Sequence, residues 1–444
     1  MVELIPRKVL FGNPERVSPR LSPDGSRLAW IAPKDGVLNV WLAPVSPQAG
    51  VDWDQAEVVT DDTDRGIRTF AWAHDNKHLL YLQDTGGDEN WRLHDVDLTT
   101  MTRRDLTPFD GVRTEIVAME RDFPTEVLVG LNKDNPQLHD VYRLDLTTGE
   151  LTKEIVNPGF LAWLADSRLA VRGAFAPQPD GGIVIMVRDG ADDDWRELLT
   201  IPAEDALTTD PVAFSADGQS LLMVSSVGEE TARLIRIDLA TGAQEVLAAD
   251  PEADISGVRV NPDTKEPQIV VVLKDRSEYI VLDPSVADDL AAIRALHPGD
   301  PNFVSADDAD ATWLIAFTND SGPIPFFAYD RATRQGSFLF EHQPALSQYT
   351  WPRWSRSRSP PATACSSTAT RRSRRTGREP GCRPCSTCTA GRGPGTRGAM
   401  TPRLNGWPTA ATSPFRSTSA ARPGTGSRSS TRATGSGAPR CRTT

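Results

Sequence analysis

The first 350 residues of this 444-residue chain contain no cysteine, and all five cysteines lie beyond that point. A body without thiols forms no disulfide, which fits a reducing compartment. Long apolar runs are also absent, since "IVVVL" at 269–273 has the length of a strand and is far too short to span a membrane. The first residues, "MVELIPRKVLFG", lack the apolar centre of a signal peptide. These absences predict a soluble, cytoplasmic protein without a membrane partner.

The last part of the chain lacks most large side chains. Residues 351–444 contain no Val, Ile, Asp, Lys, His, Tyr or Gln. They hold 18 Arg and one Glu, whereas the first 350 residues hold 59 acidic and 30 basic residues. A segment so poor in apolar side chains cannot bury enough surface to offset the entropy of ordering its backbone. We therefore expect a disordered, low-complexity tail rich in Arg, Ser, Gly and Pro.

The body, in contrast, repeats one pattern about every 45 residues. The pattern is a strand, a turn with Asp and Gly, a second apolar strand, and a third strand that a polar hairpin joins to a fourth. "PVAFSADGQSLLMVSS" followed by "ARLIRIDLATGAQEVL" is the clearest copy. Gly25 and Gly218 are predicted to take positive φ at the first turn, and Gly149 and Gly242 at the hairpin.

Seven copies of this four-stranded unit are present, and each has two largely apolar faces. Stacking them radially buries those faces, so the sequence predicts an all-β fold with a seven-bladed β-propeller. We expect an N-terminal arm over 1–17, the propeller over 18–345, and the tail over 346–444. "LIPRKVLFG" is expected to form a short helix or an extended arm outside the blades, and Ala287–Leu296 a helix.

Two stretches of the body resemble a known family. "LFGNPERVSPRLSPDGSRLAWIAPKDGVLNVW" and "DRGIRTFAWAHDNKHLLYLQDTGGDENWRLHDVDL" are similar to the propeller of the prolyl oligopeptidase superfamily of serine peptidases. Within it they resemble the acylaminoacyl-peptidase and dipeptidyl-aminopeptidase branch, and the likeness covers residues 1 to about 350. The resemblance implies a following α/β-hydrolase domain with a Ser on a G-x-S-x-G turn, an Asp and a His. The propeller would cap that site and admit short peptides.

This chain has no G-x-S-x-G sequence, so no catalytic residue can be assigned in it. The tail instead fits a hydrolase domain translated one base out of register. Regrouped codons of "GCRPCSTCTAGRGPG" permit L-P-A-V-L-Y-V-H-G-G-P-W, and those of "RSTSAARPGTG" permit V-N-F-R-G-S-T-G-Y-G. "WPRWSRSRSPPATAC" and "NGWPTAAT" also permit phrases that look like the family's first hydrolase strands. We interpret the tail from about Thr350 as an out-of-frame remnant of that domain.

The same reading explains the tail's motifs. Cys382, Cys385 and Cys388 have the spacing of metal ligands, but they lack a nearby His or a well-spaced fourth Cys. "WSRSRSP" and "GRGPGTRG" imitate RNA-binding tracts, whose charge would bind polyanions without specificity. We therefore predict no metal, no cofactor and no specific nucleic acid. All six histidines are interpreted as structural or surface residues: His74, His78, His94, His139, His297 and His342.

A candidate substrate-binding loop lies in "GGDENW" at 86–91. Asp88, Glu89 and Asn90 would present carboxylates and an amide suited to the free amine of a peptide, the role of acidic propeller loops in related aminopeptidases. The alternative is an ordinary charged hairpin tip.

Three functions therefore stand open. The first is the substrate-gating propeller of a serine peptidase that cleaves short peptides or N-terminal aminoacyl or dipeptidyl groups, inactive as written because the triad is missing. The second is a stand-alone propeller that serves as a protein-binding scaffold. The third is an interaction protein whose basic tail carries the function. Short peptides are the expected partners only if a hydrolase domain is joined to the propeller.

Overall fold

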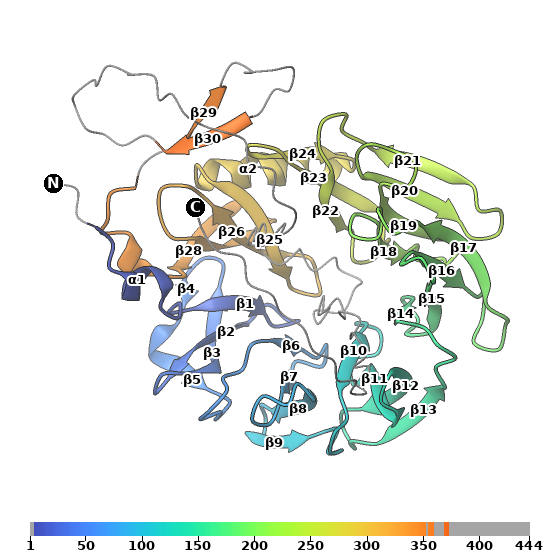
Figure 1. Cartoon of the computed structure of the whole chain (residues 1–444). Helices are drawn as coiled ribbons and strands as arrows, with labels where there is room; N and C mark the ends of the chain where they lie inside the picture. The colour runs from blue at the N-terminus through green and yellow to red at the C-terminus, as the bar shows by residue number, and fades with distance from the viewer. Residues whose placement is uncertain (1–3, 352–353, 359–367, 373–444) are drawn as a thin grey trace, which may run out of the picture.

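The computed structural model describes residues 4–351, 354–358 and 368–372, with side chains in the first of these ranges. Within the described chain, residues 17–341 form seven antiparallel sheets around a common axis (Figure 1). The predicted seven-bladed propeller is therefore confirmed. Each sheet is built from strands that are consecutive in the sequence.

The first four blades have these strands. Blade 1 contains β1 (Val17–Leu21), β2 (Arg27–Lys34), β3 (Val37–Ser46), β4 (Gly50–Val51) and β5 (Glu57–Val58). Blade 2 contains β6 (Phe70–Trp72), β7 (His78–Gln83), β8 (Arg92–Asp97) and β9 (Thr102–Asp105). Blade 3 contains β10 (Thr114–Ala118), β11 (Glu126–Asn135), β12 (Leu138–Asp145) and β13 (Leu151–Ile155). Blade 4 contains β14 (Ala162–Ala165), β15 (Val171–Pro177), β16 (Ile183–Val187) and β17 (Arg196–Ile201).

The last three blades complete the ring. Blade 5 contains β18 (Asp210–Phe214), β19 (Ser220–Ser225), β20 (Arg233–Asp238) and β21 (Gln244–Ala248). Blade 6 contains β22 (Ile255–Val260), β23 (Pro267–Leu273) and β24 (Ser277–Val281). Blade 7 contains β25 (Asp300–Ala306), β26 (Thr312–Thr318), β27 (Pro325–Asp330) and β28 (Gln335–Glu341).

Strand direction divides the loops between two faces of the ring. The chain enters β1 and leaves β28 at one end, which we call the terminal face. Because neighbouring strands are antiparallel, the turns between first and second strands lie at the opposite end, which we call the far face. Loops between second and third strands, and the connections between blades, return to the terminal face.

Blade 6 departs from the predicted four-stranded plan. Its fourth strand is replaced by a 3₁₀ turn (η2, Pro284–Val286) and α2 (Ala287–Leu296), the helix that the sequence predicted. Pro284 lacks the N–H that a ladder needs, and the Asp283 side chain accepts a hydrogen bond from Ser285 N at 2.9 Å, which starts the helical turn. Leu290 and Ile293 of α2 are buried against blade 7.

The turn glycines adopt the predicted conformation. Gly25 and Gly218 both have φ of 71° in the first turns of blades 1 and 5. Gly149 and Gly242 have φ of 78° and 70° at the hairpins of blades 3 and 5. A side chain at these positions would be strained, so glycine fixes where each strand pair reverses.

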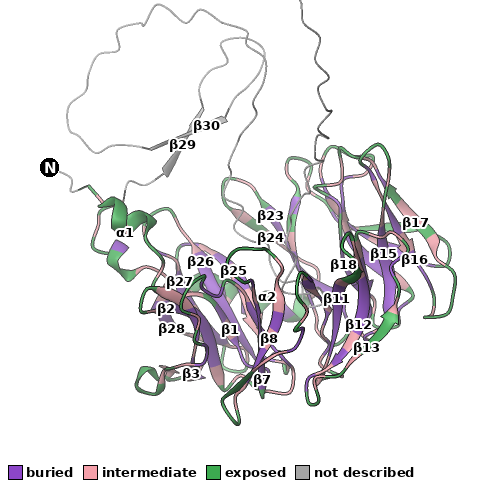
Figure 2. Ribbon diagram, turned by 60° about the horizontal axis from the view of Figure 1, so that its bottom comes forward, coloured by how far each residue is buried: buried purple, intermediate pink, exposed green. Residues whose placement is uncertain are grey.

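The core lies between the blades. Neighbouring sheets pack face to face, and the middle of most strands is buried (Figure 2). Between blades 1 and 2, for example, Ile31 and Val40 meet Leu79 and Val96, all at most 1% exposed. Burying such a side chain contributes roughly 1.5–3 kcal/mol. This repeated packing explains why the units of the sequence do not occur singly.

The ring has one seam, between blades 1 and 7. As at every other interface between blades of the described chain, no strand is shared, but here the two blades are the first and the last in the sequence and are not joined by a connecting loop. The seam is joined by an apolar cluster that includes Trp30 and Leu314, and by a hydrogen bond from Arg20 Nη1 to the Val304 carbonyl at 2.6 Å. Another bond runs from Leu21 N to Ser305 Oγ at 3.2 Å. Side chains and a few backbone groups thus carry the closure.

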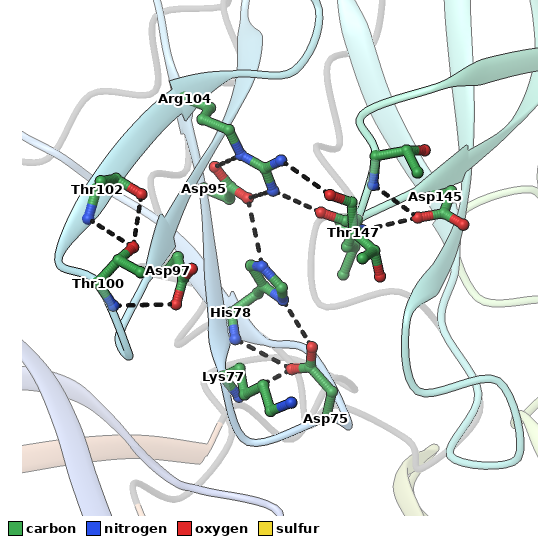
Figure 3. A network of polar contacts seen from close by, with 12 residues as sticks. Asp75, Lys77, His78, Asp95, Asp97, Thr100, Thr102, Arg104, Asp145 and Thr147 are labelled. Carbon is green, nitrogen blue, oxygen red and sulfur yellow. Dashed lines mark hydrogen bonds and ion pairs between the residues drawn. The ribbon is translucent and has the colours of Figure 1, made fainter.

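A buried polar network joins blades 2 and 3 (Figure 3). Asp95 on β8 is fully buried and forms ion pairs with Arg104 and with His78, whose Nε2 lies 3.9 Å from Asp95 Oδ2. His78 Nδ1 also lies 2.6 Å from Asp75 Oδ2. Arg104 Nη1 donates a hydrogen bond to the Thr147 carbonyl of blade 3 at 3.4 Å. The hydrogen bond to Asp75 raises the pKa of His78 above its ordinary value.

We predict a pH dependence of stability from His78. Its pKa is raised in the folded chain, so the stabilisation is fully present below the unfolded pKa of about 6.5 and is lost as pH rises through the folded value. Urea unfolding should show His78→Gln less stable than the unchanged chain by roughly 1.5–3 kcal/mol near pH 6, with a smaller gap near pH 9.

His94 provides a control of opposite sign. Burial lowers the pKa of His94 in the folded chain. Its contribution to the free energy of unfolding is therefore lost as pH falls below the pKa that the histidine has in the unfolded chain. The gap between the unchanged chain and His94→Gln should therefore narrow toward pH 6. Parallel pH profiles for both variants would contradict the assignment.

The chain ends flank the ring. α1 (Arg7–Phe11) lies against η3 (Pro344–Leu346), and Gln343 Nε2 donates to the Gly12 carbonyl at 3.2 Å. A further 3₁₀ turn, η1 (Trp53–Gln55), lies at the edge of blade 1. Within the tail, β29 (Trp354–Arg358) and β30 (Thr368–Arg372) pair antiparallel, which the composition did not predict. The remainder of the tail prediction lies outside the described residues. No helix of the described chain is long and apolar enough to cross a membrane.

Candidate functional site

The "GGDENW" loop joins β7 to β8, the second and third strands of blade 2, and so lies at the terminal face. Gly86 and Gly87 have φ of 61° and 86°. These left-handed conformations let the chain turn out of β7 and back toward β8. The structure thus places Asp88, Glu89 and Asn90 together at the tip of one exposed turn.

Asp88 and Asn90 shape the loop. The Asp88 carboxylate accepts hydrogen bonds from Thr85 N at 3.2 Å and from Asn90 N at 3.1 Å. The Asn90 side-chain amide donates to its other oxygen at 3.2 Å. These bonds lower the pKa of Asp88, so its carboxylate stays ionised while it holds the turn. Both side chains are therefore committed to local structure.

Glu89 differs from its neighbours. Its side chain is exposed, and no group within residues 4–351 forms a hydrogen bond or ion pair with its carboxylate. Its backbone has φ of 59°, a left-handed conformation that is uncommon for a residue with a side chain. Eight other non-glycine residues of the described chain share this conformation, most of them in turns, so it fixes the Glu89 backbone at the tip of the loop without itself indicating a function. Of the three predicted residues, Glu89 is the one whose carboxylate can receive a ligand.

An ion pair beneath the loop was missed by the sequence analysis. Arg65, from the connection between blades 1 and 2, approaches buried Asp84 with Nε 3.4 Å from Oδ1. Asp84 Oδ2 in turn accepts a hydrogen bond from Glu89 N at 3.4 Å. A Cβ atom at Gly87 would lie 3.3 Å from the Arg65 guanidinium. Arg65 and Asp84 thus position the Glu89 backbone, although they lie 19 residues apart.

The arrangement suits a cation with N–H donors. An exposed carboxylate held on a fixed backbone can accept hydrogen bonds from an ammonium group, and such charge-assisted bonds are shorter and stronger than neutral ones. Among the described residues, no cluster of three or more His, Cys, Asp or Glu is arranged to hold a metal ion. The Cys382, Cys385 and Cys388 triplet lies outside the described residues.

Exposed apolar side chains gather on the terminal face. Seven of the large hydrophobic residues that the described chain exposes belong to the N-terminal arm or to loops and strand ends at this face: Leu4, Leu10, Phe11, Val156, Leu161, Leu207 and Leu273. Leu207 is 77% exposed and Phe11 78%. A single exposed apolar side chain is normal on a protein surface, but several of them on one face are compatible with a surface that a further domain covers.

Fold and loop together define the class of protein, a seven-bladed propeller that presents an acidic loop at the face where its chain begins and ends. Comparison with known proteins makes this more specific. The chain is 39% identical over 345 residues to dipeptidyl aminopeptidase BIII of Pseudoxanthomonas mexicana, a match that covers 78% of this chain and 49% of that protein. It is 26% identical over 365 residues to dipeptidyl peptidase family member 6 of Caenorhabditis elegans, covering 79% and 48%.

Solved structures agree on the fold. A prolyl endopeptidase superposes with a TM-score of 0.55 at 13% identity, covering 81% of this chain and 54% of that one. A puromycin-hydrolysing peptidase of Mycobacterium tuberculosis superposes with a TM-score of 0.52 at 14% identity, covering 81% and 58%. No family model matches the chain.

The body is therefore the propeller part of a prolyl oligopeptidase-family peptidase, as the sequence resemblance indicated. The chain spans about half the length of the curated relatives that it matches.

Proposed function

We propose that residues 1 to about 350 are the substrate-gating propeller of a serine peptidase that removes aminoacyl or dipeptidyl groups from short peptides. One observation carries the proposal. The match to a dipeptidyl aminopeptidase extends over 345 residues, about the length of the body. It covers 49% of that relative. The activity of the whole protein would reside in the half that has no counterpart here.

The tail explains the missing half. Its regrouped codons permit the first phrases of a hydrolase domain, beginning near Thr350, where the composition changes. We propose that a single-base shift at this point, in the gene or in its sequencing, replaced the hydrolase domain with the Arg-rich tail. The 444-residue chain then lacks a nucleophile, a base and an oxyanion hole, and it hydrolyses no peptide.

The terminal face supports this arrangement. It is the face from which the chain leaves β28, so a following domain would begin there. It also carries the exposed apolar residues, including Leu161 and Leu207. A domain docked on these residues would bury them and would stand over the Glu89 loop. Glu89 would then bind the free amine of a peptide whose scissile bond lies in that domain.

The DNA sequence around codon 350 tests the proposal. We expect one inserted or missing base, whose correction opens a frame that encodes the hydrolase strands and runs past residue 444. A corrected frame should also contain a G-x-S-x-G turn, because the family's serine sits on one. If the DNA beyond codon 350, read in the shifted frame, encodes neither hydrolase strands nor a G-x-S-x-G turn, the stand-alone scaffold becomes the better explanation.

A further inference from the structure

Six charged or titratable side chains meet at the far face, away from the Glu89 loop. They come from the turns between first and second strands of four blades: His74 (blade 2), Glu120 and Arg121 (blade 3), Asp263 and Lys265 (blade 6), and Asp308 (blade 7). Lys265 Nζ lies 3.2 Å from Glu120 Oε2. Both residues are buried, with 7% and 8% of their surfaces exposed.

The pair must cross the interior of the ring. Blades 3 and 6 are separated by blades 4 and 5 on one side and by blades 2, 1 and 7 on the other. They therefore stand on nearly opposite sides of the axis (Figure 1). A direct contact between Glu120 and Lys265 is possible only near the axis, where both side chains become buried.

The surrounding contacts tie the same centre to both sides of the seam. Arg121 Nη1 donates to the Asp308 carbonyl at 2.9 Å, and its Nη2 pairs with Asp263. His74 Nδ1 lies 2.8 Å from Asp308 Oδ2. The Asp308 backbone N–H donates to the Pro23 carbonyl of blade 1 at 2.7 Å. Blade 7 is thus held from blades 1, 2 and 3 through one turn.

We propose that these six residues form a latch across the ring axis that keeps the seam between blades 1 and 7 closed. The chain does not connect blade 7 directly to blade 1, so the two blades can separate by breaking the non-covalent contacts of one interface, which combine side-chain packing with a few hydrogen bonds to the backbone. Separation also requires Asp308 to leave His74 and Arg121. The latch therefore couples opening of the seam to rupture of contacts at the far face. It does not depend on the proposed peptidase function.

Hydrogen exchange on the 444-residue chain tests the latch. In Lys265→Met, Glu120 is left buried without its partner, which is strongly unfavourable. We expect exchange at the seam amides of Leu21 and Asp308 to accelerate at least tenfold. Amides of blade 5, such as Leu239, should keep their rates, because opening of the seam leaves that blade intact.

Lys274→Met is the matched control. Lys274 follows β23 at the terminal face, and it forms an ion pair of 2.8 Å with Asp250 in the connection between blades 5 and 6. This variant should leave seam exchange unchanged. The charge-swapped variant Glu120→Lys with Lys265→Glu should restore most of the protection that Lys265→Met removes. If Lys265→Met does not fold, Arg121→Gln removes the bridge to Asp308 without leaving an unpaired buried charge.

Two results would overturn the latch. The first is that the amides of Leu21 and Asp308 exchange at the same rate in Lys265→Met as in the unchanged chain. The same result in Arg121→Gln counts equally where that variant is used. The second is an equal acceleration in blade 5 and at the seam, because that pattern reports global unfolding.

Discussion

A gene with one base restored near codon 350, read to its next stop codon, is expected to yield a chain that hydrolyses small aminoacyl or dipeptidyl substrates. The 444-residue chain should hydrolyse none. In this family catalysis needs a serine, a histidine and an oxyanion hole that converge on one carbonyl carbon. Loss of a catalytic triad costs on the order of a millionfold in rate, so the contrast should be close to all or nothing.

The measurement is turnover of a chromogenic dipeptidyl substrate by both purified chains. A serine-directed phosphonate should label and inhibit the restored chain alone. Turnover by the 444-residue chain, free of host peptidases and blocked by that phosphonate, would disprove the frameshift proposal. An inactive restored chain that folds correctly would instead favour a binding scaffold.

In the restored enzyme, Glu89→Gln is expected to raise KM for substrates with a free N-terminal amine by about tenfold to a hundredfold. This range corresponds to the loss of a hydrogen bond between charged groups, worth roughly 1.5–3 kcal/mol. Substrates with a blocked amine should keep their KM, because they carry no ammonium group for the carboxylate. Steady-state kinetics with a matched free and blocked pair measures the difference.

Glu230→Gln is the control for a general effect of charge. Glu230 is an exposed carboxylate in the corresponding loop of blade 5, also at the terminal face. It should leave both KM values unchanged. An equal rise for free and blocked substrates in Glu89→Gln would show that the loop is an ordinary charged hairpin tip. That outcome leaves the peptidase proposal itself standing.

The sequence predicted features that depend on neighbours in the chain. Gly25 and Gly149 marked turns because positive φ is a local requirement. The bounds of α2 were readable because Ala287–Leu296 carries a helical pattern after a proline. The exposed position of Glu89 also followed from its loop. The sequence did not show that Asp88 holds the turn while the Glu89 carboxylate stays free. This difference depends on which side chain reaches which backbone N–H.

Contacts across the ring were beyond the sequence analysis. Lys265 and Glu120 are 145 residues apart, and nothing in either turn indicates its partner. The bond between Arg121 and Asp308 spans 187 residues. Blade 6 was assigned a fourth strand because the repeat was extended by analogy, whereas Pro284 turns the chain into α2. Contacts such as Lys265 with Glu120 form only when the ring closes, and the repeat in the sequence gives no information about them.

The consecutive order of strands within each blade bears on synthesis at the ribosome. Each sheet can form as soon as its own stretch has emerged, because its hydrogen-bonded partners are neighbours in the sequence. The seam and the contacts at the far face must wait, since β1 is made first and β25 to β28 last. A reading frame that changes after Glu341 deletes no strand of the ring. The nascent propeller can therefore complete its seven sheets whatever the codons beyond it specify.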